Sequence, residues 1–426
     1  MARKHYDWKL GEPLPEIGAH SIVKHTVFAK YVDRYIRILS PHPAKRELSL
    51  TIIDGFCGGG KYAFGDRTID GSPIVLLRAV RSTEAEMALA RQNGFVVKSD
   101  FFFVDKICDH IAFLRTELLK TEFGNEVGAS IQLAAANFES AAPAIIQAVK
   151  RKGPSNRALF FLDQYGWSDV SFAAIRNIFT ELKNPEVLLT FSVDSLIDYF
   201  RTQATATRSG RAIELTPEFS ASLVAAKTEQ GARYVIQNFL YRHIRTKTGA
   251  LFYTPFFIRS AENHRSYWLL HLSKHERARD EMARLHWEMS NTFVHQGGAG
   301  FNALGFDPNV DPDQRALEFD FGSDARADSL NAALCELPKL IRDDAQDQGV
   351  PVTIGELFKA RCNDTPLTME LVSEAVVKLR DEFQEVEVLT PDGKVRPKAI
   401  NLGWSDQVRT TRQRTFFRAL ALPHPQ

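Results

Sequence analysis

The chain has 426 residues, a length that fits two or three domains of ordinary size or one large α/β domain with additions. Hydrophobic residues make up 44% of the chain and charged residues 25%, which excludes a disordered, collagen-like or disulfide-scaffold protein. The 53 Lys and Arg residues balance 52 Asp and Glu residues, so affinity for nucleic acid would have to come from local clusters of charge.

Cysteine spacing and hydropathy bear on metal binding and location. The 4 cysteines show no CxxC or Cys/His spacing, which argues against a zinc or iron–sulfur site and fits a reducing compartment. No stretch of about 18 apolar residues occurs, and no apolar run follows the basic N-terminus. We therefore expect a cytoplasmic protein that binds no metal and is neither exported nor inserted in a membrane.

Short apolar runs alternate with helical periodicity between residues 20 and 193. Strands are predicted over residues 48–53, 101–104, 130–134, 158–162 and 187–193. Helices are predicted over residues 20–39, 72–90, 108–121 and 170–182. This alternation predicts an α/β fold with a doubly wound, mostly parallel sheet, in which ligands bind at the carboxyl ends of the strands.

Two later apolar runs, residues 251–258 and 267–272, flank a polar turn. They predict a hairpin that adds antiparallel strands to the edge of the sheet. Between the sheet strands and this hairpin, a small, polar and basic stretch near residues 201–212 predicts an inserted loop.

The C-terminal part of the chain has a different pattern. Predicted helices (329–344, 354–361, 368–383) are followed by predicted strands (386–389, 395–402) that join through the turn Pro391-Asp392-Gly393-Lys394. Helices followed by such a hairpin predict a winged helix. The expected organisation is an arm and helix (1–45), an α/β domain (46–292), a Gly-, Asp- and Asn-rich linker (293–328) and a winged-helix nucleic-acid-binding domain (329–426).

The most informative segment is the glycine-rich loop that follows the first predicted strand. Asp54 ends the strand, and Gly55, Gly58 and Gly60 allow backbone N–H groups to approach a ligand. The loop also matches the phosphate-binding pattern GxxxxGK, but Tyr62 replaces the Ser or Thr that binds magnesium, and an Asp54 carboxylate would repel phosphates. A positively charged ligand fits better, and S-adenosylmethionine, with a sulfonium and an ammonium group, is the predicted cofactor.

Two further strand ends complete the predicted cofactor site. Asp105 would accept hydrogen bonds from ribose hydroxyls, and Asn137 and Phe138 would bind and flank the adenine. The simpler alternative is that these residues are ordinary strand caps. The cofactor prediction requires that the carboxylates converge and that the glycine bend is open to a ligand.

The loop after the fourth predicted strand, Asp163-Gln164-Tyr165-Gly166-Trp167, carries the candidate catalytic residues. DNA amino-methyltransferases hold the target amine with an Asp/Asn-Pro-Pro-Tyr loop at this position, and Asp163 and Tyr165 would take the corresponding roles. Both prolines are absent here. The alternative is a structural turn whose aromatic residues pack against a neighbouring helix.

Basic residues recur in segments predicted to be exposed, and their guanidinium and ammonium groups suit phosphate backbones. The predicted nucleic-acid-binding residues are Arg208 and Arg211 in the inserted loop, Lys394 and Arg396 in the wing, and Arg409, Arg412 and Arg414 near the C-terminus. The alternative is an ordinary solvated surface.

Four motifs together resemble those of the three-Cys-motif partner (TcmP) family, over roughly the first 290 residues. They are residues 20–25 (HSIVKH), 53–60 (IDGFCGGG), 71–74 (GSPI) and 161–166 (FLDQYG). The resemblance implies a class I methyltransferase-like Rossmann fold. It also implies a radical-SAM partner bearing three cluster-binding cysteines, and a role in nucleic-acid repair or modification. Gln164 departs from the family's Asp-Pro-Tyr/Phe-Gly pattern, which weakens the transfer of a catalytic role to this loop.

These observations lead to one principal hypothesis and two alternatives. The principal hypothesis is an S-adenosylmethionine-binding, methyltransferase-like protein that acts on nucleic acid, DNA in particular. The first alternative is a catalytically silent DNA-binding subunit of the radical-SAM partner. The second is a metal-dependent nuclease built on the acidic strand ends.

Overall fold

The computed structural model covers residues 1–426. It describes residues 6–164, 166, 168–192, 208–214, 243–259, 266–289, 293–296, 300–301, 318–320, 324–345 and 349–411. The chain divides into two compact units, Met1–Leu285 and His286–Gln426. Among the described helices, none is both long enough and apolar enough to cross a membrane.

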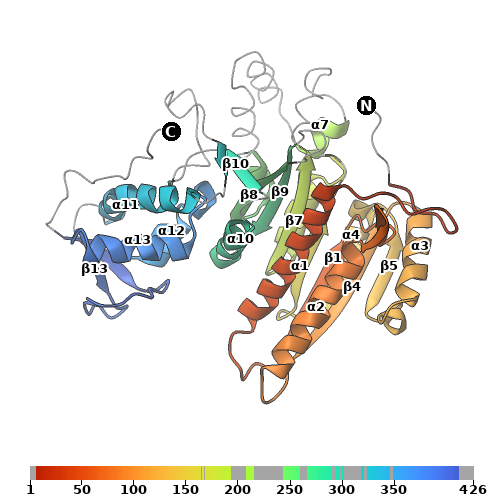
Figure 1. Cartoon of the computed structure of the whole chain (residues 1–426), viewed down its shortest axis with the longest axis horizontal. Coiled ribbons are helices and arrows are strands. Elements are labelled where there is room, and N and C mark those ends of the chain that lie inside the picture. Colours follow the sequence, from red (N-terminus) through yellow and green to blue (C-terminus); the bar gives the residue numbers. More distant parts are fainter. Residues whose placement is uncertain are drawn as a thin grey trace, which may run out of the picture. The chain divides into compact units, whose positions relative to one another are not determined.

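The first unit contains the predicted alternation of strands and helices (Figure 1). Its strands are β1 Glu47–Asp54, β2 Lys61–Phe64, β3 Arg67–Asp70, β4 Val96–Asp105, β5 Ile131–Ala135, β6 Arg157–Leu162, β7 Pro185–Ser192, β8 Phe252–Arg259 and β9 Ser266–Ser273. Its helices are α1 Ala19–Leu39, α2 Ser72–Leu89, α3 Cys108–Leu119, α4 Phe138–Arg151, α5 Phe172–Glu181 and α7 Arg208–Ala212, and α10 Glu276–Glu288 spans the division between the units.

The main sheet of this unit has the strand order β8-β9-β7-β6-β1-β4-β5. Strand β1 pairs in parallel with β4 on one side and with β6 on the other, and β5 and β7 extend the sheet in parallel. Strand β9 pairs antiparallel with β7 and with β8. The prediction of a doubly wound, mostly parallel sheet with an antiparallel edge hairpin is therefore confirmed. The strand order reverses at β1, and ligands of such sheets bind at this crossover.

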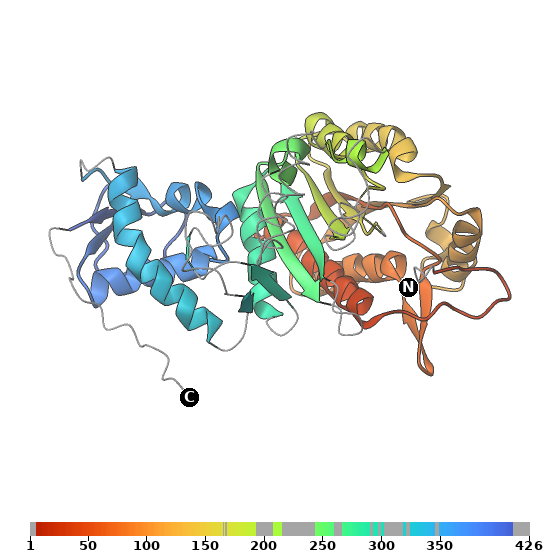
Figure 2. The same ribbon diagram turned by 90° about the horizontal axis from the view of Figure 1, so that it is seen from above.

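Helices cover both faces of the sheet (Figure 2). Helices α1 and α2 lie together on one face, and α4 and α5 lie on the other. The strands between them are apolar on both sides, and every residue of β7 is buried. Burial of each large side chain in this core contributes roughly 1.5–3 kcal/mol, and this double covering explains why the strands appear in the sequence as continuous apolar runs.

Helix α1 buries one face against this layer. Val27, Tyr31 and Tyr35 recur at the helical spacing and are buried, as the periodicity predicts. The same face also buries Lys24 and His25, two polar residues whose burial the periodicity does not explain. The helix ends at Leu39, before Pro41.

Several elements of the first unit were not predicted: α4, the hairpin of β2 and β3, α10, and α7, which lies where the sequence predicts an inserted loop. Helix α4 follows β5 directly, and its buried residues do have helical spacing (Phe138, Ala142, Ile145, Ile146, Val149). The helical spacing was missed because Pro143 lies inside the helix, where proline is usually unfavourable, and because Asn137, next to its first residue, was interpreted as part of a ligand-binding loop. The hairpin of β2 and β3 is short and only half-buried, so its apolar pattern is weak.

The second unit combines helices with short antiparallel strands. Its elements are β10 Phe293–Gln296, β11 Glu318–Asp320, α11 Ala325–Asp344, β12 Val352–Thr353, α12 Ile354–Lys359, α13 Met369–Asp381, β13 Val386–Leu389 and β14 Gln407–Thr410. Strands β12, β14 and β13 form one sheet in that order. The antiparallel pair β10 and β11 and the start of α11 lie within the predicted linker, residues 293–328.

The predicted strand over residues 395–402 is wrong. Strand β13 pairs instead with β14, and residue 395 makes only an isolated bridge with Leu389. Pro397 lies in the middle of the predicted strand and has no N–H group to donate to a ladder. The partner strand therefore starts ten residues further along, at Gln407.

Candidate functional site

Three carboxylates lie at the ends of adjacent parallel strands. Asp54 ends β1 and Asp105 ends β4, and Asp163 comes directly after β6. Asp54 is in register with Phe103 of β4 and Phe161 of β6, so the three acids share one edge of the sheet. The charges of Asp163 and Asp105 both raise the pKa of Asp54, which places the three groups within electrostatic range. The structure therefore places the three acids at one edge of the sheet, as the strand ends predict.

Asp54 is the most deeply buried of the three, with 1% of its surface exposed. Burial raises its pKa to about 7, although hydrogen bonding from Ser72 and the Phe56 N–H opposes the shift. The Phe56 N–H lies 3.1 Å from Oδ1. Near neutral pH this carboxyl therefore exchanges between its neutral and charged forms, and a nearby cation would favour the charged one.

The glycine bend is covered by the chain's own N-terminal arm. A Cβ atom at Gly58 would lie 2.7 Å from the Trp8 ring, and one at Gly59 would lie 2.3 Å from it. Trp8 is 3% exposed, and its Nε1 donates to the Lys61 carbonyl at 2.6 Å. The expectation that the bend is open to a ligand is therefore corrected. The sequence predicted only an N-terminal arm, and nothing in it shows where the arm packs.

The other predicted glycines have their own packing roles. Gly60 has a φ of +79°, which favours glycine, and a Cβ there would meet Leu114 at 2.5 Å. Gly55 lies against Leu162 and Phe138, whose atoms would be 2.7 and 2.8 Å from a Cβ. Phe138 is buried at the start of α4, so it packs beneath the bend. In this structure it is not placed to flank a base.

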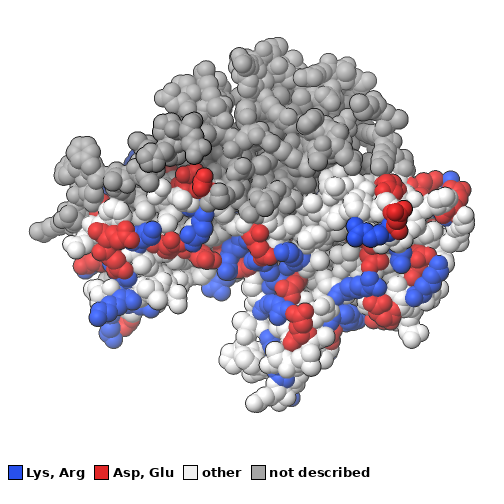
Figure 3. All heavy atoms as spheres, viewed as in Figure 1, with Lys and Arg blue, Asp and Glu red and all other residues white. Residues whose placement is uncertain are grey.

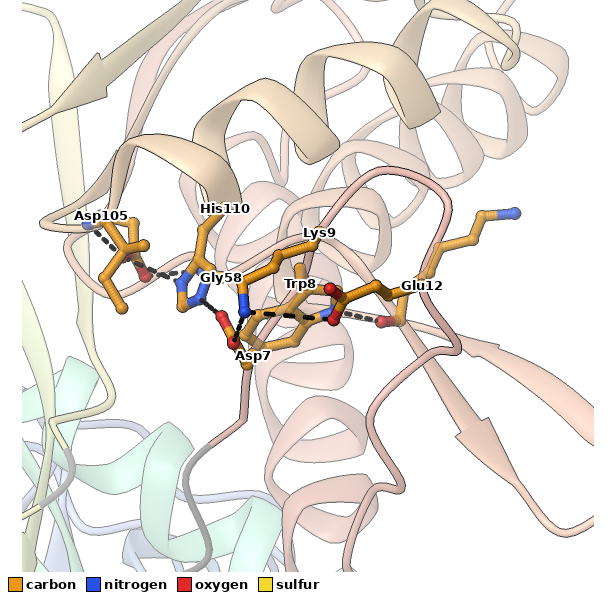
Figure 4. A network of polar contacts seen from close by, with 9 residues as sticks. Asp7, Trp8, Lys9, Glu12, Gly58, Asp105 and His110 are labelled. Atoms are coloured by element: carbon orange, nitrogen blue, oxygen red, sulfur yellow. Dashed lines mark hydrogen bonds and ion pairs between the residues drawn. The ribbon is translucent and has the colours of Figure 1, made fainter.

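Asp105 is held by three hydrogen-bonding groups of the chain (Figure 4). Its Oδ2 accepts from the Gly58 N–H at 3.2 Å, and its Oδ1 accepts from the Ile107 N–H at 2.9 Å. Nδ1 of His110 lies 3.2 Å from Oδ1, and the other ring nitrogen lies 3.4 Å from Oδ1 of Asp7. A carboxylate offers about four acceptor positions, so one remains for a ribose hydroxyl. The roles of His110 and Asp7 were not predicted.

Asn137 lies at the same edge, after β5. It is exposed at the N-terminus of α4, where its carbonyl accepts from the N–H groups of Ser140 and Ala141. Its side chain makes no capping hydrogen bond to the helix. The side-chain amide is thus on the surface, where the prediction requires it.

Asp163 forms an ion pair with Lys24 of α1. The ammonium nitrogen lies 2.6 Å from each carboxylate oxygen. The Lys24 side chain is 8% exposed and the Asp163 side chain is 21% exposed. Burial alone would raise the pKa of Asp163, but the Lys24 charge holds it below its usual value. Asp163 is therefore ionised and already paired, which differs from the free acceptor that the catalytic prediction assumed.

His25 lies beside this pair. Burial lowers its pKa to about 4, so it is neutral at pH 7. Its Nδ1 atom is buried and has no hydrogen-bond partner among the described residues. The sequence placed Lys24 and His25 on the first helix, but it did not predict that they face the fourth-strand loop.

The departure at Gln164 has a structural explanation. The side chain is buried, and its Oε1 accepts from the N–H groups of Asp169 and Val170, each at 3.0 Å. These bonds close the turn that leads into α5. The predicted catalytic Tyr165, together with Trp167, lies outside the described residues.

The predicted nucleic-acid-binding residues of the second unit are paired with acids. Lys394 pairs with Asp392, Arg396 with Asp406 and Arg409 with Glu387. Lys and Arg are interspersed with Asp and Glu on the described part of the face drawn in Figure 3. In the first unit, Arg211 is exposed in α7. The side chain of Arg208 and both Arg412 and Arg414 lie outside what the structure describes.

The structure also bears on metal binding. Within the described residues, no cluster of three or more His, Cys, Asp or Glu side chains has an arrangement that could hold a metal ion.

Comparisons with known proteins give distant structural matches. No protein-family model matches the sequence, and no curated protein matches it significantly. A Legionella pneumophila protein of the DUF519 family is 12% identical, with a TM-score of 0.38 over 64% of this chain and 91% of that one. Trm1 from Pyrococcus horikoshii, in complex with S-adenosyl-L-methionine, is 10% identical, with a TM-score of 0.33 over 95% and 94%.

A third match is an S-adenosylmethionine-dependent methyltransferase from Agrobacterium tumefaciens. It is 12% identical, with a TM-score of 0.28 over 61% of this chain and 64% of that one. All three TM-scores are below 0.5, so the chemistry of the site is argued from its own geometry.

Proposed function

We propose that the first unit binds S-adenosylmethionine at the carboxyl ends of β1 and β4, and that it is a methyltransferase-like protein acting on nucleic acid. One observation carries the proposal. Asp54 and Asp105 end neighbouring parallel strands at the point where the strand order reverses, with a glycine bend between them.

Each part of the cofactor has a chemically suitable group at this edge. Ionised Asp54 would attract the sulfonium or ammonium group, because a buried carboxylate gains most from a nearby cation. Asp105 has an acceptor position for a ribose hydroxyl, and the exposed Asn137 amide is available to the adenine. Helix α2 begins at Ser72, and no side chain caps its first N–H groups. These N–H groups at the positive end of the helix dipole would suit the cofactor's carboxylate.

Titration calorimetry with S-adenosylmethionine and S-adenosylhomocysteine tests this site. We expect both to bind, and we expect Asp105→Asn to weaken binding by about tenfold or more, since a hydrogen bond to a charged group contributes roughly 1.5–3 kcal/mol. Asp392→Asn, an exposed carboxylate of the second unit, is the matched control and should bind as the wild type does. Absence of heat from both the wild type and Trp8→Ala, with the fold intact, would overturn the proposal.

A second candidate function is favoured by the Lys24–Asp163 pair. Because the ammonium lies 2.6 Å from both oxygens, Asp163 is not available to polarise an amine unless Lys24 moves. This supports a catalytically silent subunit that presents nucleic acid to a radical-SAM partner in DNA repair or modification. Transfer of a labelled methyl group from S-adenosylmethionine to DNA or RNA by the isolated chain would exclude it. Co-purification with the partner, unchanged by Asp163→Ala, would favour it.

For the second unit we propose a winged-helix domain. The support is its element order, three helices with a strand before the second, and its sheet order β12-β14-β13. Lys394 is 82% exposed beside Asp392 in the predicted wing, so its ammonium could exchange this partner for a phosphate. Fluorescence anisotropy with labelled DNA and RNA tests the role. We expect binding that weakens with salt and with Lys394→Ala, and salt-independent binding would contradict a phosphate contact.

A further inference from the structure

We propose that the N-terminal arm, residues 6–12, is an intramolecular cover that occupies the glycine bend and must leave before a nucleoside ligand binds there. The proposal rests on the proposed cofactor site. It adds a competition between two occupants of the same surface: the arm, which the structure shows, and the ligand.

The indole of Trp8 is the principal contact. It lies over Gly58 and Gly59 so closely that neither position has room for a Cβ atom, and its N–H donates to the Lys61 carbonyl. The Tyr62 ring packs against its edge, with centroids 5.0 Å apart. A flat heteroaromatic ring with an N–H donor therefore fills the space above the bend. A nucleoside cofactor that used the N–H groups of this bend would need the same space.

A polar contact connects the arm to the predicted ribose-binding carboxylate. Asp7 lies 3.4 Å from His110, and His110 lies 3.2 Å from Asp105 (Figure 4). The His110 ring also packs edge-on against Trp8, with centroids 4.8 Å apart. Asp105 thus holds the bend through the Gly58 N–H and holds the arm through His110. A ligand that draws on Asp105 would disturb both contacts.

The arm has a fixed end and a turn that suit release of its first part. The Ile17 N–H donates to the Ala63 carbonyl and the Ala63 N–H donates to the Pro15 carbonyl, so the end of the arm is attached to β2. Gly11, with a φ of +84° and open space around it, lies between this attachment and Trp8. The segment before Gly11 could therefore swing away while residues 15–17 stay in place.

Two further residues of the arm, Tyr6 and Lys9, also make contacts. Tyr6 packs edge-on against Tyr62, with centroids 5.3 Å apart, and its hydroxyl accepts from the Gly18 N–H at 3.3 Å. Lys9 pairs with Asp7 at 2.9 Å, but both side chains are about half exposed, and exposed pairs of this kind add little. Trp8 is the residue that fills the space above the bend, so removal of the indole is the change that should open it.

Two measurements on the full-length chain test the cover, with Leu10→Ala as the matched control because Leu10 is an exposed residue of the same arm. Hydrogen exchange of residues 54–64 reports the cover without any ligand. Calorimetry with S-adenosylhomocysteine reports the competition. We expect Trp8→Ala to speed exchange of the bend amides and to tighten binding by about tenfold or more, because the binding-competent state is no longer a minor one. Leu10→Ala should match the wild type in both.

The possible results distinguish the cover, its competition with the ligand and the cofactor assignment. Unchanged exchange in Trp8→Ala overturns the cover. Measurable binding that is no tighter in Trp8→Ala and in a chain that starts at residue 13 than in the wild type overturns the competition. Weaker binding in both variants also overturns it and makes the arm part of the ligand site. Faster exchange with no heat from any variant upholds the cover and overturns the cofactor assignment instead. Circular dichroism establishes that each variant is folded.

Discussion

Two ion pairs, one from each unit, differ in how exposed they are and therefore in what they contribute to stability. At the carboxyl edge of the first unit, Lys24 and Asp163 are 8% and 21% exposed, and Asp54 is 1% exposed. In the second unit, Lys394 and Asp392 are 82% and 61% exposed. Buried charges are costly and are kept where they are paired or needed, whereas exposed pairs are nearly neutral. The buried pair, which lies at the edge of the sheet where Asp54 and Asp105 also lie, should therefore be much more sensitive to the loss of one partner than the exposed pair is.

The largest expected effect comes from removal of one partner of the buried pair. Asp163→Ala leaves the Lys24 ammonium without its partner in a buried position, and we expect the free energy of unfolding to fall by about 3–5 kcal/mol in urea denaturation. The double variant Lys24→Met/Asp163→Leu, which removes both charges, should recover most of this loss. A loss below about 1 kcal/mol for Asp163→Ala would place this pair with the exposed ones and remove the contrast.

The second prediction concerns pH. Asp54 has a folded-state pKa raised to about 7, so the folded chain binds its proton more tightly and stability falls as pH rises from about 4 to 7. His25 has a folded-state pKa lowered to about 4, so stability rises over nearly the same range, up to about pH 6.5. In the wild type the two effects largely cancel.

Single variants should uncover each effect. Asp54→Asn should leave a stability that rises by on the order of 3 kcal/mol between pH 4 and 7, and His25→Asn should leave one that falls by a similar amount. Thermal or urea denaturation across this range measures both, with the profile of Asp392→Asn as the control. Parallel pH profiles for the two variants would contradict the burial of these groups.

A smaller effect is expected at the covered bend. In Gly59→Ala the new Cβ would lie 2.3 Å from the Trp8 ring, so the arm must shift, at a cost of about 1–3 kcal/mol. Trypsin should then cleave after Lys9 more rapidly. Gly166→Ala is the matched control because nothing lies within 4 Å of its Cβ position. Equal cleavage rates in the two variants would show that the arm does not depend on the bend.

The smallest effect is expected in the second unit. Arg409 and Glu387 are 41% and 40% exposed, so Arg409→Ala should change the free energy of unfolding by no more than about 1 kcal/mol. Glu387→Ala should behave alike, and urea denaturation measures both. A loss comparable to that of Asp163→Ala would mean that exposure does not set the contribution of these two pairs.

The sequence predicts those parts of the molecule that depend on local pattern. Apolar runs buried on both faces predict the parallel strands, and the ends of those strands place Asp54, Asp105 and Asp163 at one edge. The predicted strand over residues 395–402 is absent. Its apolar residues suggested a strand, but Pro397 has no N–H group for the ladder of hydrogen bonds.

The partners of the site residues could not be predicted in the same way. Lys24 is 139 residues from Asp163, and Asp7 is 103 residues from His110. No local spacing specifies such pairs, because they form only when α1 and the arm pack against the sheet. The covering of the bend by Trp8 is of the same kind, and it changes the interpretation of the glycine loop more than any local feature does.

The central claim is that the edge formed by the ends of β1 and β4 holds a nucleoside cofactor. A crystal structure of the full-length chain grown with S-adenosylhomocysteine tests it most directly. We expect ligand density beside Asp54 and Asp105, with Trp8 displaced from Gly58 and Gly59. Density elsewhere, or an unliganded edge with Trp8 in place at saturating ligand, would contradict it.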